Sequence, residues 1–240
     1  MIQIFVISLK NSVERRQVIE QKLANVDFQF FDADNLRAEP DHFIFSLYDR
    51  SKTKKYKGYE LTVAELGCFA SHVSLWQKSV ELNKSILILE DNIEITEGFF
   101  SYLPKLPALV EKYGVLKLCN LFESDYKVVE EVDGQCQVVT YLTKPGLGTQ
   151  GYAITSSAAQ RYLDIVPGFF EPVDNFMEHE WRTKQTIYSL NPNLINRAAV
   201  VSTIGKRKVK TSSSPFSKIV PEFYRAYVKI RRAIYNKRYK

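Results

Sequence analysis

This sequence of 240 residues lacks long hydrophobic runs. No stretch approaches the roughly 18 consecutive apolar residues that a membrane-spanning helix requires. Residues 1–9 run straight into a strand-like pattern, without the basic, apolar and cleavable segments of a secretory leader. We therefore expect a cytoplasmic protein without a membrane span. Its hydrophobic content of 45% is sufficient for a substantial core.

Cysteine is scarce as well. The three cysteines, Cys68, Cys119 and Cys136, are odd in number, lie in apolar or strand-like contexts and lack the spacing of metal ligands. Buried free thiols are the favoured interpretation. The pattern indicates neither a disulfide framework nor a zinc site.

Acidic residues are nearly absent from residues 206–240, which carry twelve lysines or arginines against the single acid Glu222. The preceding residues carry 21 bases and 26 acids, a net charge of −5, so the overall charge of +6 arises in the C-terminal segment. This composition changes near Gly205. We therefore predict one main domain over residues 1–205 and a basic extension over residues 206–240.

The extension has the pattern of an amphipathic helix. Four apolar residues fall at helical intervals and define one stripe: Phe223, Tyr227, Ile230 and Ile234. Basic residues occupy much of the rest of the helix surface. Near an anionic lipid surface, each contributes about 1 kcal/mol of favourable binding free energy. Two interpretations remain open: a helix bound to a membrane surface, and a helix docked on its own domain with a solvated basic face. No recognition motif accompanies the charge, so we expect no nucleic-acid partner.

The main domain alternates strand-like and helical patterns. Apolar runs predict strands at residues 3–9, 28–31, 86–89, 115–121, 137–142 and 151–154. Helical spacing predicts helices at residues 13–23, 63–82, 98–113 and 156–163. Thr62 and Glu65 have the capping-box spacing for the second helix, and Ser156 is the expected cap of the fourth. Residues 39–58 are polar and rich in lysine, and we interpret them as a loop.

The strand at residues 86–89 ends abruptly in Glu90, Asp91 and Asn92. Its apolar run is typical of a strand buried on both faces, and open α/β sheets bind ligands at the carboxyl ends of such strands. Carboxylate and amide oxygens suit Mg²⁺ or Mn²⁺, and such a cation stabilises the charge that develops on a departing diphosphate. A solvated strand exit is the alternative. The pattern indicates a metal-assisted site for a diphosphate compound.

Six short motifs follow one another along the chain. They are V-I-S-L at 6–9, E-R-R at 14–16, L-T-V-A-E-L-G-C-F-A-S-H at 61–72, I-L-E-D-N at 88–92, G-T-Q-G-Y at 148–152 and P-V-D at 172–174. This ordered set resembles glycosyltransferase family 25, whose bacterial members build lipooligosaccharide. The likeness extends over residues 2–181.

The resemblance implies an α/β fold of the GT-A type, with a mostly parallel central sheet flanked by helices. It also implies transfer of a hexose with inversion, assisted by Mn²⁺ or Mg²⁺, from a UDP-sugar to a lipooligosaccharide or lipopolysaccharide sugar. The donor is commonly UDP-galactose and sometimes UDP-glucose. The expected location is the cytosolic face of the inner membrane of a Gram-negative bacterium, where the basic extension would contact anionic lipid. The alternative is a nucleotide-sugar or glycan-binding protein of the same fold with weakened catalysis.

The resemblance also implies roles for individual residues. Asp91 and Asn92 are the expected metal ligands, although the family motif usually reads E-D-D, and the uncharged Asn92 would bind a metal more weakly than a carboxylate. Donor binding is expected of a larger set: Ser8, Leu9, Arg15, Arg16, Asp32, Ser71, His72, Glu90, Gly148, Thr149, Gln150 and Tyr152. Asp32, together with Asp34, would accept hydrogen bonds from uracil or ribose, and the alternative is that both are ordinary turn residues.

Inverting transfer needs a general base that removes the proton of the acceptor hydroxyl. Asp174 of the P-V-D motif is the candidate, and the alternative is a residue that caps a helix beginning at Asn175. Arg15 or Arg16 can pair bidentately with phosphate, with a charged helix face as the alternative. For His72, a structural hydrogen bond beneath the site is as well supported as contact with the sugar.

Overall fold

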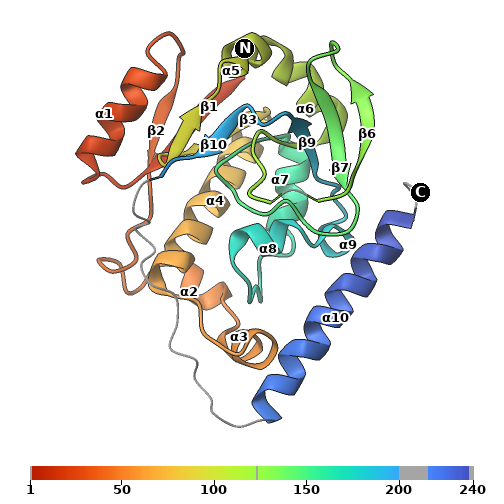
Figure 1. Cartoon of the computed structure of the whole chain (residues 1–240). Helices are drawn as coiled ribbons and strands as arrows, with labels where there is room; N and C mark the ends of the chain where they lie inside the picture. Colours follow the sequence, from red (N-terminus) through yellow and green to blue (C-terminus); the bar gives the residue numbers. More distant parts are fainter. Residues whose placement is uncertain (1, 123, 200–215, 238–240) are drawn as a thin grey trace.

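The computed structural model describes residues 2–122, 124–199 and 216–237. Within these ranges a central sheet contains eight strands (Figure 1). In spatial order they are β2 (Gln29–Asp32), β1 (Gln3–Ser8), β3 (Ile86–Glu90), β8 (Gly151–Ile154), β5 (Val115–Lys117), β9 (Tyr188–Asn191), β7 (Gln137–Tyr141) and β6 (Tyr126–Glu131). A separate ribbon pairs β4 (Ile93–Ile95) with β10 (Ile195–Arg197). A strand is present at each of the six predicted places, although the one expected over residues 115–121 ends at Lys117, and β4, β6, β9 and β10 were not predicted.

The sheet is mixed in direction. β2, β1 and β3 run parallel, as do β5 and β9, whereas β8, β7 and β6 run antiparallel to their neighbours. The expected parallel arrangement therefore describes the half that contains β1 and β3, and the other half differs. β6 and β7 are joined by a short turn, and only antiparallel strands can be joined in this way because a parallel pair needs a long crossover.

Helices cover both faces of the sheet, so the predicted α/β class is confirmed. The helices are α1 (Val13–Lys22), α2 (Ile44–Leu47), α3 (Arg50–Lys57), α4 (Val63–Leu82), α5 (Gly98–Tyr102), α6 (Leu106–Tyr113), α7 (Ser156–Leu163), α8 (Val173–Met177), α9 (Glu180–Thr183) and α10 (Phe216–Asn236). The capping box of α4 is confirmed, because Thr62 Oγ1 accepts from Glu65 N while Glu65 Oε2 accepts from Thr62 N. The cap of α7 is Thr155 rather than Ser156, since Thr155 Oγ1 accepts from Ala158 N.

The interpretation of residues 39–58 as a loop was wrong, because this segment contains α2 and α3. Asp49 caps α3 by accepting a hydrogen bond from Lys52 N, and Gly58 ends the helix at a φ of 75°. Thr53 is the one residue of α3 that is buried. A helix that buries so little has no apolar stripe, so its sequence does not show the helical period.

Alternate residues of the central strands face two separate cores. In β3, Ile86 and Ile88 pack with α4 and α7, whereas Leu87 and Leu89 pack with α1 and α6 on the opposite face. All four side chains are 0% exposed, which confirms the prediction of a strand buried on both faces. The end of this strand is therefore held in place from both sides of the sheet.

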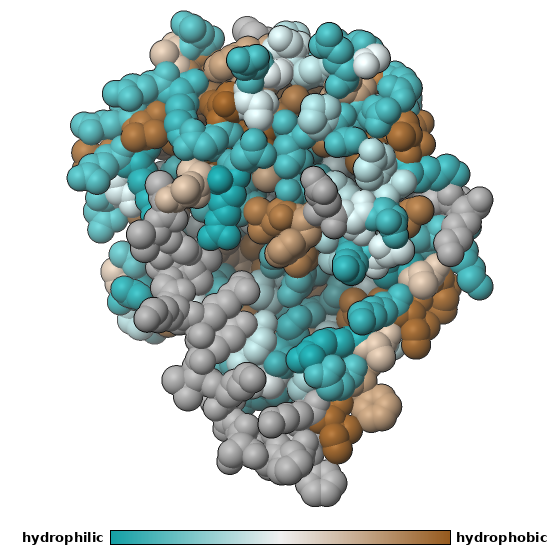
Figure 2. Space-filling view, in the orientation of Figure 1, coloured by the Kyte–Doolittle hydropathy of each residue, from teal (hydrophilic) through white to brown (hydrophobic). Residues whose placement is uncertain are grey.

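The C-terminal helix α10 runs along one side of the molecule and is docked on the main domain (Figure 1). Two of its residues, Arg232 and Asn236, are buried against that domain, so the helix is docked, but the expectation that its basic face is the solvated one is wrong in part. The face left to solvent is the apolar stripe, with Phe223 73% and Ile230 58% exposed. Figure 2 shows these hydrophobic side chains along the outer edge of α10. The predicted boundary at Gly205 lies outside the described residues.

The structure bears on two expectations from the sequence, one about membrane-spanning helices and one about the cysteines. No helix within the described ranges has the length and apolar character needed to cross a membrane. Cys68, Cys119 and Cys136 are free thiols, as predicted, with Cys119 and Cys136 buried and Cys68 half-buried.

Candidate functional site

The ends of β1 and β3 lie side by side because the two strands are parallel and in register, with Ile7 opposite Glu90. Asp91 N donates to Ile7 O at 3.1 Å, and Ser8 Oγ donates to Asp91 Oδ2 at 2.7 Å. The acidic residues that follow β3 are thereby fixed at the edge of the sheet where the sequence predicted a ligand site.

A first cavity of about 320 Å³ opens at this edge, between the strand ends and the N-terminal half of α4. It brings together eight of the predicted site residues: Ser8, Leu9, Arg15, Ser71, His72, Glu90, Asp91 and Asn92. Its size and its mixture of apolar walls with a few polar groups are typical of a small-molecule site.

A second cavity of about 540 Å³ adjoins the first. It is lined by further predicted residues: Gly148, Thr149, Gln150 and Asp174. Cys68, Glu90 and Asn92 belong to the walls of both cavities, so the two form one continuous site that meets at the end of β3. A ligand with two parts could therefore place one part in each cavity.

Glu90 carries a negative charge at this junction. Thr149 Oγ1 donates to Glu90 Oε1 at 2.6 Å, and His72 Nε2 lies 3.7 Å from the same oxygen. Burial alone would raise the pKa of Glu90, but the neighbouring His72 and the hydrogen bond from Thr149 outweigh it and hold the pKa below its usual value. Glu90 is ionised at neutral pH.

His72 is oriented by a buried tyrosine. Trp76 Nε1 donates to Tyr152 OH at 2.8 Å, and Tyr152 OH lies 2.8 Å from His72 Nδ1. The contact between the phenolic oxygen and Nδ1 fixes the plane of the imidazole ring, with Nε2 on the side of Glu90. Tyr152 is 0% exposed and lines neither cavity, so it lies behind His72 rather than at the cavity surface.

Besides Tyr152, two more of the predicted donor-binding residues, Arg16 and Asp32, lie outside both cavities. Arg16 donates to Ser8 O at 2.9 Å and to Asp32 Oδ1 at 2.5 Å, and its guanidinium lies 4.8 Å from the centre of the Phe30 ring. These contacts join β1, α1 and β2. The neighbouring Arg15 instead lines the first cavity and donates to Asp91 Oδ1 at 3.1 Å.

Asp34, which was expected with Asp32 to accept hydrogen bonds from uracil or ribose, lies in the first cavity, where burial raises its pKa against the opposing effect of His42. Its backbone is close to α4 because Gly67 has no side chain, and a Cβ at Gly67 would lie 2.6 Å from Asp34 O. Other residues that line the site were not predicted. Arg37 in the first cavity and Arg197 in the second add positive charge. The glycine inside the α4 motif was the available signal for this close approach.

The end of β3 fits a hard divalent cation. Asn92 Oδ1 is buried and has no hydrogen-bond partner, and Glu90 supplies an ionised carboxylate beside it. Both oxygens of Asp91 already accept hydrogen bonds, from Ser8 and Arg15. Cys68 and His72 also have ligand atoms within 4.8 Å of Glu90, a grouping that forms only when α4 packs on β3. Burial raises the pKa of the Cys68 thiol well above its usual value.

Comparison with known proteins identifies relatives. The family model described as glycosyltransferase family 25 (LPS biosynthesis protein) matches residues 1–177. A putative glycosyltransferase of Haemophilus influenzae is 30% identical over 177 residues, 71% of this chain and 59% of that protein. Procollagen galactosyltransferase 2 of Mus musculus is 30% identical over 190 residues, 73% of this chain and 29% of that protein.

The chain is also similar to a lipooligosaccharide biosynthesis protein and aligns with one solved structure. The lipooligosaccharide biosynthesis protein lic2B of Haemophilus influenzae is 27% identical over 168 residues, 65% of this chain and 60% of that protein. The chain therefore spans less than two thirds of the length of these curated relatives. The structure of A197 from STIV aligns with 79% of this chain and 81% of its own, at a TM-score of 0.41 and 13% identity.

Proposed function

This chain belongs to glycosyltransferase family 25, as its motifs predicted, and we propose that it transfers a hexose from a UDP-sugar to a sugar of lipooligosaccharide or lipopolysaccharide. Galactose is the favoured hexose and glucose the alternative. One observation carries the proposal: two cavities meet at Glu90 and Asn92, which suits a donor whose diphosphate lies at the junction. A GT-A-type arrangement of donor and acceptor is part of the same proposal.

The first cavity is assigned to the nucleotide. Arg15 supplies a guanidinium, the group best suited to pair with phosphate oxygens, and its orientation is fixed by Asp91. Asp34 supplies hydrogen-bond acceptors farther along the same wall. The nucleotide would thus be held by polar contacts at both ends of the cavity.

A divalent cation, Mn²⁺ or Mg²⁺, would be held by Glu90 and Asn92, with Asp91 as a further ligand. When bound, it would neutralise charge that develops on the diphosphate as the sugar leaves. The protein's own contribution is to present Asn92 Oδ1 without a competing hydrogen bond and to keep Glu90 ionised through His72 and Thr149.

The second cavity is assigned to the transferred sugar and the acceptor. Asp174 lines it and is the proposed general base, taking the proton of the acceptor hydroxyl. The acceptor oxygen then bonds to the anomeric carbon as the bond to the diphosphate breaks, and UDP departs with the bonding electrons. Attack from the face opposite the diphosphate inverts the anomeric configuration. Gly148, Thr149 and Gln150 form the wall beside the sugar.

The decisive experiment measures release of UDP. The full chain is incubated with UDP-galactose or UDP-glucose, Mn²⁺ and truncated lipooligosaccharide acceptors, and free UDP and the elongated glycan are detected. We expect acceptor-dependent release with one of these donors. Binding of UDP-sugar with no turnover on any acceptor would favour the nucleotide-sugar or glycan-binding alternative.

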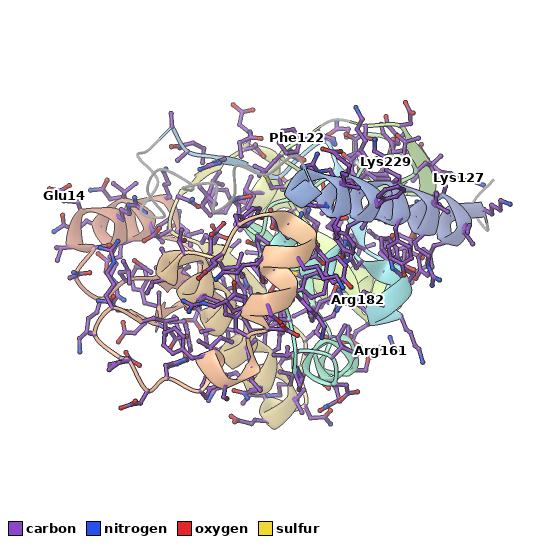
Figure 3. All side chains as sticks on the ribbon, turned by 90° about the horizontal axis from the view of Figure 1, so that it is seen from below. Glu14, Phe122, Lys127, Arg161, Arg182 and Lys229 are labelled. Atoms are coloured by element: carbon purple, nitrogen blue, oxygen red, sulfur yellow. The ribbon has the colours of Figure 1, made fainter. Side chains whose placement is uncertain are left out.

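We also propose that α10 contacts anionic lipid at the cytosolic face of the inner membrane. The exposed apolar stripe is accompanied by exposed basic side chains on the same helix, Arg225, Lys229 and Arg231, and by Lys237 directly after it. Figure 3 labels Lys229, one of these exposed residues of α10. Apolar area together with basic charge is the combination that holds peripheral helices on anionic bilayers.

Vesicle co-sedimentation tests this contact. We expect binding to vesicles of phosphatidylglycerol and phosphatidylcholine, reduced at high salt, and little binding to phosphatidylcholine alone. Phe223→Ser with Ile230→Ser should abolish binding, whereas the control Val13→Ser, at an exposed apolar residue of α1, should not. Equal binding by all variants would contradict the assignment of α10.

A further inference from the structure

The loop between β7 and β8, residues 142–150, adopts a conformation that needs external support. Leu147 has a φ of 47° and Gly148 a φ of 78°, so two consecutive residues lie in the left-handed region. Glycine adopts this region freely, but leucine does so at an energetic cost. Because this loop forms a wall of the second cavity, whatever holds Leu147 also shapes that cavity.

A buried ion pair holds both backbone groups of Leu147. Lys117 Nζ donates to Leu147 O at 2.6 Å, and Leu147 N donates to Glu178 Oε1 at 3.1 Å. Lys117 and Glu178 pair with each other at 3.1 Å, and their side chains are 2% and 7% exposed. The pair thus takes the place of the backbone partners that a regular strand or turn would supply.

The C-terminal helix α10 contacts this ion pair through Arg232. Arg232 Nη2 donates to Glu178 O at 2.5 Å and lies 3.4 Å from Glu178 Oε2, while Arg232 Nη1 lies 3.5 Å from Glu180 Oε2. The Arg232 side chain is 4% exposed, and its guanidinium lies 6.0 Å from the centre of the Trp181 ring. Arg232 therefore fixes both the backbone and the carboxylate of Glu178.

A second residue of α10 holds the start of the loop. Asn236 Nδ2 donates to Tyr141 O at 3.1 Å and to Leu142 O at 2.8 Å. Arg232 and Asn236 are four residues apart and so lie on the same face of the helix. The helix consequently holds the β7–β8 loop at its first residues directly and at Leu147 through Glu178.

We propose that Arg232 is a positioning residue, which acts with Asn236 through Glu178 and Lys117 to set the β7–β8 loop for binding of the sugar and acceptor. Assignment of the second cavity to these ligands rests on the function proposed above. The loop also carries Thr149, whose hydroxyl donates to Glu90.

Hydrogen exchange of the full chain tests the physical part of this proposal. In Arg232→Met we expect amide exchange over residues 143–150 to become at least about 10-fold faster, while exchange over residues 3–8 stays unchanged. Arg231→Met removes the neighbouring exposed arginine and is the matched control, with exchange like the parent. Unchanged exchange in the loop of folded Arg232→Met would overturn the proposal.

Comparison of the acceptor KM and kcat with the Kd for UDP provides a readout that loss of stability alone would not produce. Arg232→Met should raise the acceptor KM by about 10-fold or more and lower kcat, while the Kd for UDP, measured calorimetrically, changes less than about twofold. Arg232→Lys, which keeps the charge but not the fork of donors, should recover part of the loss. Equal losses of UDP binding and of acceptor binding would show a merely structural role.

Leu147→Gly supplies a second variant if Arg232→Met fails to fold. Glycine accepts the left-handed conformation without cost, so the loop should depend less on Arg232, and the effect of Arg232→Lys should shrink in the Leu147→Gly background. Additive effects would contradict the proposed connection. If the parent transfers no sugar at all, the proposed function fails, whereas the exchange measurements still decide whether α10 positions the loop.

Discussion

Ser8 Oγ donates a 2.7 Å hydrogen bond to Asp91 Oδ2, and this contact joins the ends of two parallel strands. The second oxygen of Asp91 accepts from Arg15 at 3.1 Å. A single carboxylate thus connects β1, β3 and α1 at the wall of the first cavity. Its charge is neutralised in part by Arg15, which leaves Glu90 as the acidic group that faces both cavities.

Asp91→Ala should abolish transfer, with kcat/KM reduced by a factor of about 100 or more. The variant removes a predicted metal ligand and also releases Arg15, whose pairing with phosphate depends on its orientation. Steady-state kinetics measures the loss, and calorimetry with Mn²⁺ and UDP measures binding. Asp32→Asn, which alters an exposed carboxylate outside the cavities, should stay close to the parent. Identical calorimetry for Asp91→Ala and the parent would remove Asp91 from the site.

Asn92→Asp should preserve or tighten the binding of Mn²⁺. The buried Oδ1 of Asn92 lacks a hydrogen-bond partner, and a carboxylate at the same place adds the charge that hard cations prefer. Calorimetric titration of Mn²⁺ in the presence of UDP gives the Kd of each variant. Asn92→Ala, which deletes the oxygen, should bind Mn²⁺ more weakly than the parent. A common Kd for all three proteins would place the metal elsewhere.

The end of β3 could be predicted because its signals are local. A strand buried on both faces needs an uninterrupted apolar run, and the first polar residues after Leu89 mark the edge of the sheet. The capping box of α4 is also contained within four residues. The ordered motifs added Thr149 and Asp174, which the structure does bring to one cavity.

Other features depend on rotations and contacts that the sequence does not encode locally. Arg15 and Arg16 are adjacent on α1, yet about 100° of helical rotation directs one to the cavity and the other to β2. Lys117, Glu178 and Arg232 come from three distant segments and meet only in the folded chain. A pattern of spacing could not reveal that cluster.

Asp174→Asn should lose turnover by a factor of about 100 to 10,000, the range for removal of a general base. Binding of UDP-sugar should persist because the first cavity is unaltered. Steady-state kinetics gives kcat and calorimetry gives the Kd of the donor, so loss of turnover and loss of donor binding can be told apart. Asp164→Asn, at the exposed end of α7, is the matched control. Parallel loss of turnover and donor binding would favour a structural role for Asp174.

Tyr152→Phe should lower the free energy of unfolding by about 1–3 kcal/mol. The phenolic oxygen accepts from Trp76 Nε1 and contacts His72 Nδ1 inside the core, so its removal leaves buried polar groups unpaired. Urea denaturation measures the change. A raised donor KM with unchanged stability would instead indicate that the hydroxyl contacts the donor.

Glu171→Gln should change how stability depends on acidity. Burial would raise the pKa of Glu171, but hydrogen bonds and charge from His179 and Lys57 outweigh it and lower the pKa from 4.5 to about 2. His179 Nδ1 lies 2.9 Å and Lys57 Nζ 3.2 Å from the carboxylate, and Arg182 lies with them where α3, α9 and α10 meet (Figure 3). Because the native pKa lies below the unfolded one, the ionised carboxylate stabilises the fold above the unfolded pKa.

That stabilisation should be lost progressively as the pH falls from about 4.5 toward 2, by about 1.4 kcal/mol for each pH unit. Urea midpoints of the parent and Glu171→Gln should therefore differ most at neutral pH, begin to approach each other below about pH 4.5, and converge only near pH 2. Glu222→Gln, at an exposed carboxylate of α10, should differ little from the parent at any pH. A gap between parent and Glu171→Gln that stays constant across this range would contradict the lowered pKa.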